Sequence, residues 1–470
     1  MQPSNLMGQR LIQRKTITEE QLEKALERQR RQGGKLGQNL LALGSITEDE
    51  MTAFFNPVPL QPGTIEETGL TEVFINELIL KHGMDMTEFN IQDMAQATGL
   101  SPRIVDSCTT TLRQERLIEV KGAADLSKMS FRFSLTDTGR KKASDLKEIC
   151  RYTGPAPVPF KEYIQMVAMQ SIKNIDVDEE TLRKAFEGII IPDQVVKSIG
   201  PAVSSGKAIF LYGPPGNGKT SISEAISRVL PGAVYMPYAV IVDGEIIIIF
   251  DENTHRRVEV DADTGPMDQR WVRIARPVVI VGGEMTLKGL DLDYNSISKY
   301  YVAPLQVKAN NGMFLLDDFG RQQVPPQVLL NRWIVPLERG TDFLSFSTGM
   351  KIEVPFDQLV IFSTNLEPKN LVDEAFLRRI RYKIKIDSPS RENYEKIFQL
   401  VCRANKIEFK PDVFEYLIKE LYEKNNISLT ACHCRDLLDN IIDKARFMRQ
   451  EPELTQETIT DSWNTYYVPL

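Results

Sequence analysis

The segment at 208–230 constrains the fold most, because a glycine-rich loop there separates an apolar run from an amphipathic stretch. The order is AIFLY, then GPPGNGKT at 213–220, then SISEAISRVL. The apolar run predicts a buried strand, and the spacing after the loop predicts a helix. Glycines in such a loop let backbone N–H groups converge on phosphate oxygens at a helix N-terminus. We therefore expect a phosphate-binding loop in an α/β sheet; the alternative is a glycine-rich turn without a ligand.

Different loop residues are expected to bind the phosphates and the metal ion of a nucleotide. Lys219 should reach the β- and γ-phosphates, and Thr220 should ligate Mg²⁺. The residues expected to bind the nucleotide are Gly213, Pro214, Pro215, Gly216, Asn217, Gly218, Lys219 and Thr220.

Two further apolar runs end in polar residues suited to the same chemistry. MFLL precedes Asp317 and Asp318, and LVIFST precedes Asn365. We expect Asp317 on the Mg²⁺ side and Asp318 as the base or water-orienting carboxylate. Asn365 can hydrogen-bond both the γ-phosphate and the attacking water. The alternatives are acids that merely end a strand and an asparagine that merely starts a turn.

Three arginines are candidates for stabilising the charge of a phosphoryl transition state. Arg378 and Arg379 lie in AFLRRIR, and we place Arg379 first as the residue aimed into a neighbouring subunit's site. Arg435, in CHCRDLLDNI, could reach the γ-phosphate from a helical C-terminal part. The alternative is that these are solvated charges.

Residues 180–445 resemble the AAA+ ATPases, and GPPGNGKT, PLQVKANNGMFLLDD and VIFSTN are most similar to the MoxR-like, dynein-related branch. The resemblance implies an αβα core with a helical lid, ATP hydrolysis between subunits, and a homo-oligomer that is usually a hexameric ring. It also implies Walker A and Walker B motifs at 213–220 and 313–318, sensor 1 at Asn365, and a sensor-2-like Arg435. Ile189 would lie near the adenine, and 343–356 would form a hairpin before sensor 1.

The chain departs from the family pattern in two ways. Asp318 replaces the usual glutamate and is one methylene shorter, so hydrolysis could be slow or replaced by an ATP-bound switch. Lys219 also lies 98 positions before Asp317, which predicts a β-rich insertion. Its strongest signal is the Asp243-Gly244 turn between two apolar runs. Tyr300 and Tyr301 follow; we favour packed core tyrosines over pore-loop residues.

Residues 1–58 contain two similar units in a 24-5-24 layout, beginning LMGQRL and KLGQNL. Each predicts a short helix, a turn and a second helix, with capping boxes at Thr18–Gln21 and Thr47–Glu50. The repeat resembles the MshEN-like domain of secretion and pilus ATPases, which binds cyclic di-GMP. Leu6 and Lys35 stand where that family has arginine, and Val58 where it has glutamine, which puts the ligand in doubt. The alternative is a small protein-interaction domain.

Residues 64–150 predict a helix, a helix-turn-helix and a β-hairpin, which is a winged-helix pattern. Ser101 is expected to cap the helix that ends near Leu117, and a closing helix should start near Gly139. DNA could be read through Arg103 and Arg113. About eleven basic and fourteen acidic residues here, however, are unlike a DNA-reading face. A protein-docking or spacer module is the alternative that we favour.

The domain plan is multidomain α/β, since 470 residues exceed one compact core. The proline-rich stretch at 56–63 is expected to be a linker, and the one at 152–159 is expected to be a stiff joint. The expected units are an MshEN-like repeat at 1–58, a winged helix at 64–150, a proline-rich linker and helix at 151–175, a P-loop AAA+ core at 176–388 and a helical lid at 389–470.

Composition places the chain in the cytoplasm. Five cysteines without a paired framework suit a reducing compartment. The net charge of −7 gives no general attraction to nucleic acid or anionic membranes. The first ten residues are too polar for a signal peptide, and acids interrupt the apolar run at 239–250, so we expect no membrane insertion. Cys432-His433-Cys434 could bind zinc, but ordinary helix residues are the favoured interpretation.

Three functions fit these features. The first is an ATP-driven remodeller or switch acting on an unknown protein client, with a secretion or pilus context by analogy. The second is an ATP-gated DNA-binding regulator that uses the winged helix. The third is a non-hydrolysing ATP-bound scaffold, which Asp318 favours.

Overall fold

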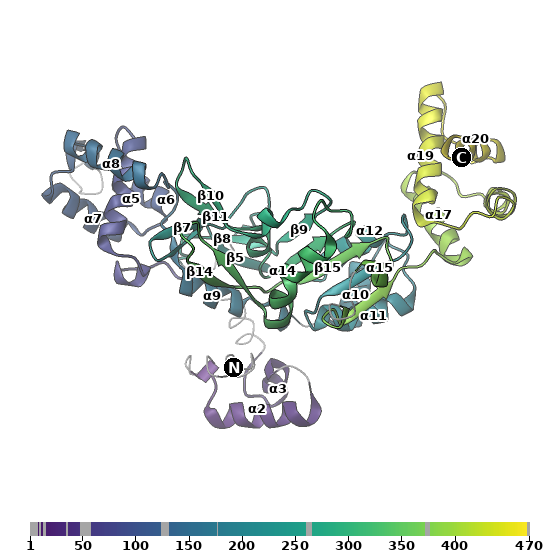
Figure 1. Ribbon diagram of the computed structural model, residues 1–470, viewed down its shortest axis with the longest axis horizontal. Coiled ribbons are helices and arrows are strands. Elements are labelled where there is room, and N and C mark those ends of the chain that lie inside the picture. Colours follow the sequence, from purple (N-terminus) through teal and green to yellow (C-terminus); the bar gives the residue numbers. More distant parts are fainter. Residues whose placement is uncertain are drawn as a thin grey trace.

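A computed structural model describes residues 8, 11–12, 16–33, 36–47, 58–123, 131–175, 177–259, 266–371 and 377–467. The repeat openers Leu6 and Lys35 lie outside these residues, as does Glu50, the predicted capping partner of Thr47. Figure 1 shows helices at both ends of the long axis and strands between them. No helix in the described part of the chain is both long and apolar enough to span a bilayer.

The first unit is a small helical pair. It contains α2 (Glu19–Gln32) and α3 (Leu36–Ala42). The predicted capping box at Thr18 is confirmed, because Thr18 Oγ1 accepts from the Gln21 N–H and Gln21 Oε1 accepts from the Thr18 N–H. Leu22 and Ala25 of α2 pack against Leu36 and Leu40 of α3, which gives the unit its own apolar core.

The second unit has the helices and hairpin expected within 64–150. They are a short 3₁₀ turn η1 (Glu66–Thr68), α5 (Glu72–Asp85), α6 (Ile91–Thr98), α7 (Pro102–Gln114), β1 (Ile118–Ala123), β2 (Phe131–Leu135) and α8 (Asp137–Ile149). One detail differs from expectation. Ser101 stands at the N-cap of α7 but makes no capping hydrogen bond, because its hydroxyl is buried without a partner. The closing helix α8 begins at Asp137, near Gly139 as expected, and Thr136 Oγ1 caps it by accepting from the Gly139 N–H.

Both proline-rich stretches make backbone contacts with the β insertion where the structure describes them, from residue 58 onward in the first stretch. The Leu60 backbone bridges to Met267, and the Gln61 N–H donates to Pro266 O at 3.0 Å. In the second stretch, β3 (Val158–Pro159) pairs in parallel with β6 (Ala239–Val242). Proline lacks one donor but still fits at a sheet edge, and burial of the apolar residues around it stabilises the packed arrangement. The helix that follows, α9 (Phe160–Met169), is also packed against the β insertion.

The predicted β-rich insertion is present. Its strands are β5 (Ala233–Pro237), β6, β7 (Glu245–Ile248), β8 (Trp271–Ala275), β10 (Asp293–Asn295) and β11 (Tyr300–Val302). The sheet order is β10-β11-β7-β6-β3, and β5 pairs separately with β8. Asp243 and Gly244 form the two-residue turn between β6 and β7 with positive φ angles of 48° and 87°. Tyr301 is buried, with its hydroxyl 2.6 Å from Ser347 Oγ, which confirms the core interpretation for that tyrosine.

The central domain is a five-stranded parallel sheet with helices on both faces. The order is β16 (Tyr382–Lys385), β4 (Ile209–Tyr212), β15 (Leu359–Thr364), β12 (Met313–Leu316) and β9 (Val278–Val281). Ile209 and Leu211 face α10 (Glu179–Ala185), α11 (Asp193–Ser204) and α12 (Lys219–Ser227), whereas Phe210 faces α14 (Pro326–Arg339). This alternation buries both faces, so the predicted α/β fold class is confirmed. A hairpin of β13 (Thr341–Ser345) and β14 (Lys351–Pro355) precedes β15, as expected.

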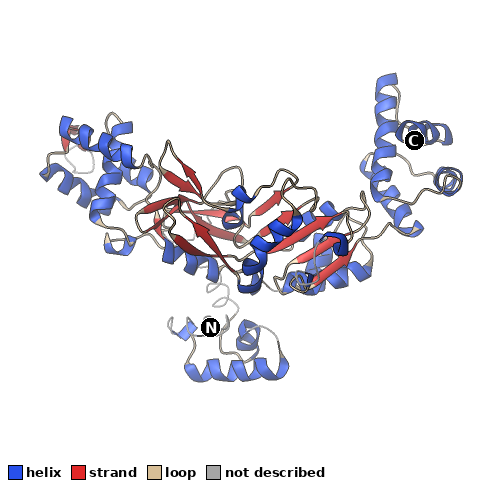
Figure 2. Ribbon diagram, in the orientation of Figure 1, coloured by secondary structure: helices blue, strands red, loops and turns tan. Residues whose placement is uncertain are grey.

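The C-terminal part is helical, as Figure 2 shows. It comprises α17 (Arg391–Ala404), α18 (Pro411–Tyr416), a π-helical turn at Leu417–Glu423, α19 (Ala431–Met448) and α20 (Gln456–Tyr466). Its core contains Tyr394, Phe398, Phe414 and Leu438. This part therefore has an apolar core of its own, separate from the two clusters that cover the sheet.

Candidate functional site

The glycine-rich loop leaves the carboxyl end of β4 and enters α12. Gly213 has a φ of 142°, and a Cβ built there would lie 2.1 Å from Ile386 O, so only glycine fits. Lys219 Nζ donates to Gly213 O and Pro214 O, both at 2.9 Å. Burial lowers the pKa of Lys219, and the nearby Asp317 and Asp318 carboxylates oppose that shift. The lysine is therefore held inside the loop by carbonyls that a phosphate could replace.

The ends of three neighbouring strands bring the predicted polar residues together. Thr220 Oγ1 donates to Asp317 Oδ2 at 2.8 Å, which pairs the two expected metal ligands. Asn365 Nδ2 donates to Asp318 Oδ1 at 3.1 Å. Asp318 has a φ of 47°, a backbone conformation uncommon for residues other than glycine. Carboxylate, hydroxyl and amide groups of this kind suit Mg²⁺ and water beside a phosphate.

These residues face a cleft of about 500 Å³ between the sheet and the C-terminal helices. The loop from Pro215 to Thr220 lines it on one side, and Ile189 lines it as expected. From the C-terminal part come Ile397, Val401 and Arg435. The cleft thus has an apolar region next to Ile189 and a polar end next to Asp317, as a nucleotide's base and phosphates require.

Arg378 and Arg379 lie elsewhere. In the part of the chain that the structure describes, neither lines this cleft. Arg378 is exposed, and Arg379 Nε donates to Glu338 Oε1 of α14. Both therefore lie outside the cleft of their own chain, and the predicted action on a neighbouring subunit stays a prediction.

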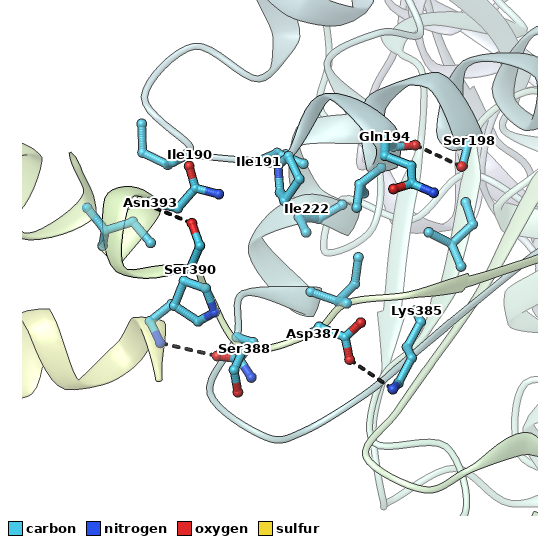
Figure 3. A pocket seen from close by; sticks show the side chains of 18 of the residues that line it. Ile190, Ile191, Gln194, Ser198, Ile222, Lys385, Asp387, Ser388, Ser390 and Asn393 are labelled. Carbon is cyan, nitrogen blue, oxygen red and sulfur yellow. Dashed lines mark hydrogen bonds and ion pairs between the residues drawn. The ribbon is translucent and has the colours of Figure 1, made fainter. Parts of the chain in front are cut away.

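A second cavity of about 530 Å³ adjoins the cleft. Figure 3 shows Ile190, Ile191 and Ile222 on one side, with Asp387 and Ser388 on the other. The cavity lies where the chain passes from β16 into α17, and it shares Asn217 and Ala431 with the cleft. The loop and both acids, however, face the first cleft, so we assign the phosphate chemistry there.

Two backbone contacts between the loop and the C-terminal helices were not predicted. The Ala431 N–H donates to Asn217 Oδ1 at 3.2 Å, and the Cys432 N–H donates to Gly216 O at 2.8 Å. These partners are more than 200 positions apart, and no local pattern reveals such a pair.

Cys432, His433 and Cys434 diverge rather than converge. Cys432 lines the cleft, whereas Cys434 is buried in the C-terminal core. The His433 ring hydrogen-bonds the Tyr467 hydroxyl at 2.7 Å, and burial lowers the pKa of His433. Among the described residues there is no group of three or more His, Cys, Asp or Glu side chains that could hold a metal ion. The three side chains thus belong to the packing of α19.

Comparison with known proteins gives local and distant similarities. Residues 390–465 match a family described as a domain of unknown function, DUF8689. A stretch of 53 residues is 43% identical to a vesicle-fusing ATPase from Dictyostelium discoideum, and it spans 11% of this chain and 7% of that protein.

Two solved structures are similar at lower identity. NtrX from Brucella abortus, solved with ATP, is 14% identical over 59% of this chain and 56% of its own, with a TM-score of 0.37. The RuvB Holliday junction branch migration motor from Thermotoga maritima is 14% identical over 61% of this chain and 73% of its own, with a TM-score of 0.35. Both TM-scores are below 0.5, so neither likeness bears on what this chain does.

The class of protein follows from the fold and the site. A phosphate loop, two acids and Asn365 meet at the carboxyl ends of adjacent parallel strands, with helices across the cleft. The local identity to a vesicle-fusing ATPase agrees with this arrangement. The chain is a P-loop α/β protein whose cleft has the lining expected of a nucleotide site.

Proposed function

We propose that this chain binds Mg²⁺-ATP in the cleft and hydrolyses it. The observation that carries the proposal is the pairing of Thr220 with Asp317 beside the pairing of Asn365 with Asp318. Thr220 and Asp317 would hold the Mg²⁺, which when bound neutralises charge on the phosphates. Lys219 would move from Gly213 O and Pro214 O to the phosphate oxygens, and the purine would lie near Ile189.

The proposed hydrolytic step uses two side chains of this chain. Asp318 would accept a proton from the attacking water, and Asn365 would orient that water through its amide. The hydrogen bond between them places both groups at the same point of the cleft. Arg435 would contact the γ-phosphate from α19, and Arg379 of a neighbouring copy would complete the site. In a hexameric ring each cleft would then depend on the next subunit.

The work done with ATP is proposed to be the remodelling or switching of a protein client. The contacts between 64–150 and the insertion support this, because they attach a docking module to the ATPase core. DNA binding through 64–150 stays the weaker proposal because of its acidic balance. A cyclic di-GMP response through 1–58, and with it a secretion or pilus role, rests on the repeat alone.

A non-hydrolysing ATP-bound scaffold is the second candidate. One observation favours it: Asp318 Oδ1 already accepts a hydrogen bond from Asn365 Nδ2, and the Asp318 side chain is shorter than that of a glutamate. A carboxylate held in this way would have limited reach toward water. In this alternative ATP would stabilise the oligomer without turning over.

Phosphate release by the purified full chain decides between the two. Lys219→Ala and Arg379→Ala should each abolish release, with the exposed Lys197→Ala and Arg228→Ala as matched controls that retain it. Mixing the two inactive variants should restore part of the activity if Arg379 acts in trans. ATP binding without release above Lys219→Ala would establish the scaffold instead. Addition of cyclic di-GMP to the same assay tests the repeat.

A further inference from the structure

We infer that Asn217 is a positioning residue that couples the phosphate loop to Arg435 by capping the first turn of α19. The inference rests on the proposed function of the cleft and assigns a role to a side chain rather than to the loop backbone. It concerns how the helical part is held over the nucleotide.

Helix α19 begins without a cap of its own. Thr430 occupies the N-cap position, with φ −133° and ψ 130°, and its side chain makes no capping hydrogen bond. Its hydroxyl instead donates to Ser428 O at a long 3.4 Å. The first N–H groups of a helix have no partner within the helix, so they must find acceptors elsewhere. The N-terminal end of this 18-residue helix lies directly against the phosphate loop.

The phosphate loop supplies those acceptors. Asn217 Oδ1 accepts from the Ala431 N–H at 3.2 Å, and Gly216 O accepts from the Cys432 N–H at 2.8 Å. Asn217 is 7% exposed, so this oxygen has little access to water as an alternative partner. Asparagine is among the best capping side chains, and here it caps a helix from another part of the fold.

The approach between the loop and α19 is close. A Cβ built on Gly216 would lie 2.6 Å from Cys432 Sγ and 2.7 Å from Thr430 Cγ2. The two elements are therefore in direct contact along Gly216 and Asn217. A change in the loop when phosphate enters would be felt at the first turn of α19.

The contact fixes the position of the predicted sensor. Arg435 is four positions after Ala431, so the two residues lie on the same face of α19, one turn apart. Asn217 and Arg435 both line the cleft. Because a helix moves as a rigid rod over one turn, the capping bond at Ala431 and the Gly216–Cys432 bond together set where Arg435 stands relative to Lys219. Loss of this bond should loosen the helical part over the nucleotide and weaken ATP binding.

The test compares Asn217→Ala with Asn405→Ala in the full chain. Asn405 also lies in the helical part, where its amide donates to Val401 O at 3.1 Å, away from the cleft. Asn217→Ala should raise the KM for ATP about fivefold, which corresponds to about 1 kcal/mol, the usual size of a lost N-cap. Asn405→Ala should leave KM unchanged. A KM for Asn217→Ala within twofold of the unaltered chain would overturn the inference.

A double variant separates positioning from simple helix stabilisation. Thr430→Asn gives α19 a local, uncharged cap, and we combine it with Asn217→Ala. Amide hydrogen exchange in a peptide covering 430–435 should be faster in Asn217→Ala and return toward normal in the double variant. The KM should stay raised, because a local cap does not restore the bond between the Asn217 side chain and α19. Full recovery of KM, or unchanged exchange in Asn217→Ala, would contradict the role assigned to Asn217.

The outcomes also distinguish this inference from the proposed function. If the unaltered chain releases no phosphate, hydrolysis fails as a proposal, and the dissociation constant for ATP replaces KM in the same comparison. The exchange experiment needs no nucleotide and judges the capping bond in either case.

Discussion

Replacing Asp268 with asparagine tests the joint between 64–150 and the β insertion. Arg270 is 1% exposed, and its guanidinium donates to both Asp268 oxygens at 2.9–3.1 Å. The third nitrogen, Nη1, donates to Thr68 O at 2.9 Å. Since Thr68 ends the turn η1 and Arg270 precedes β8, this one buried side chain joins the two units.

The cost of Asp268→Asn follows from the burial of the pair. The neutral amide would leave a buried guanidinium without its counter-charge, and breaking such a pair typically costs about 3–5 kcal/mol. Glu162 should reduce this cost. Burial raises the pKa of its carboxyl, and the nearby Arg270 opposes that shift. Without Asp268, Glu162 should ionise more readily and supply part of the missing charge. We therefore expect about 3 kcal/mol, the lower end of the range.

Hydrogen exchange measures this loss locally, which suits a chain with several units. Amides of β8 that exchange through opening of the joint should do so about a hundredfold faster in Asp268→Asn, the equivalent of about 3 kcal/mol. The control is Asp193→Asn, which removes an exposed ion pair with Arg183 at 3.0 Å and should cost under about 1 kcal/mol. If both substitutions change exchange equally, the buried pair does not hold the joint.

Three further predictions concern other parts of the molecule. Asp318→Ala should lower phosphate release at least about 100-fold with ATP binding retained, whereas Asp318→Glu should keep or raise it; loss in both would argue against a carboxylate acting on water. Trp333→Ala should cost about 3–5 kcal/mol, measured by hydrogen exchange of the β12 amides, because Trp333 is buried against Phe314 and Phe356, and a cost below about 1 kcal/mol would contradict this packing. Thermal stability should fall between pH 7 and 5.5, since burial lowers the pKa of all three histidines, His82, His255 and His433. As the pH falls through the usual histidine pKa of about 6.5, the folded chain therefore binds fewer protons than the unfolded chain. A melting temperature that rises as the pH is lowered from 7 to 5.5 would refute this prediction.

Features that depend on neighbouring residues were predictable from the sequence. The capping box of Thr18 needs only a residue three positions later, and the turn at Asp243-Gly244 needs only its own backbone preferences. The phosphate loop is equally local, because its glycines, strand and helix are contiguous. The convergence of Asp317 and Asn365 followed from a general property of parallel sheets, whose carboxyl ends share one edge.

Features that join distant segments were not predictable. The proline-rich stretches carry a linker composition, yet Val158 is buried because β6 offers it a partner far along the chain. The pair of Asp268 and Arg270 is local, but its bond to Thr68 crosses about 200 positions. The same holds for Asn217 and Ala431. Composition describes what a segment can do alone, and here tertiary contacts supplied the missing partners.

The start of β15 connects the insertion to the cleft. Asp357, two positions before that strand, accepts hydrogen bonds from the Ser171 hydroxyl at 2.7 Å and the Ile172 N–H at 3.0 Å, both just beyond α9. It also accepts from Asn311 Nδ2 at 2.9 Å. The other end of β15 leads directly to Asn365, which contacts Asp318.

One central strand therefore carries a fixed anchor at its beginning and a site residue at its end. All six of its residues are buried, and it pairs on both sides, with β12 and β4. A strand held in this way cannot shift alone, so movement of Asn365 relative to the insertion must distort β15 or break the bonds of Asp357. Through α9 and the joint at Arg270, that constraint extends to 64–150. The cleft and the proposed docking module are thus joined by a continuous packed connection. Energetic coupling between them also requires an element with two arrangements whose balance the nucleotide shifts. We expect that element to be the capped first turn of α19.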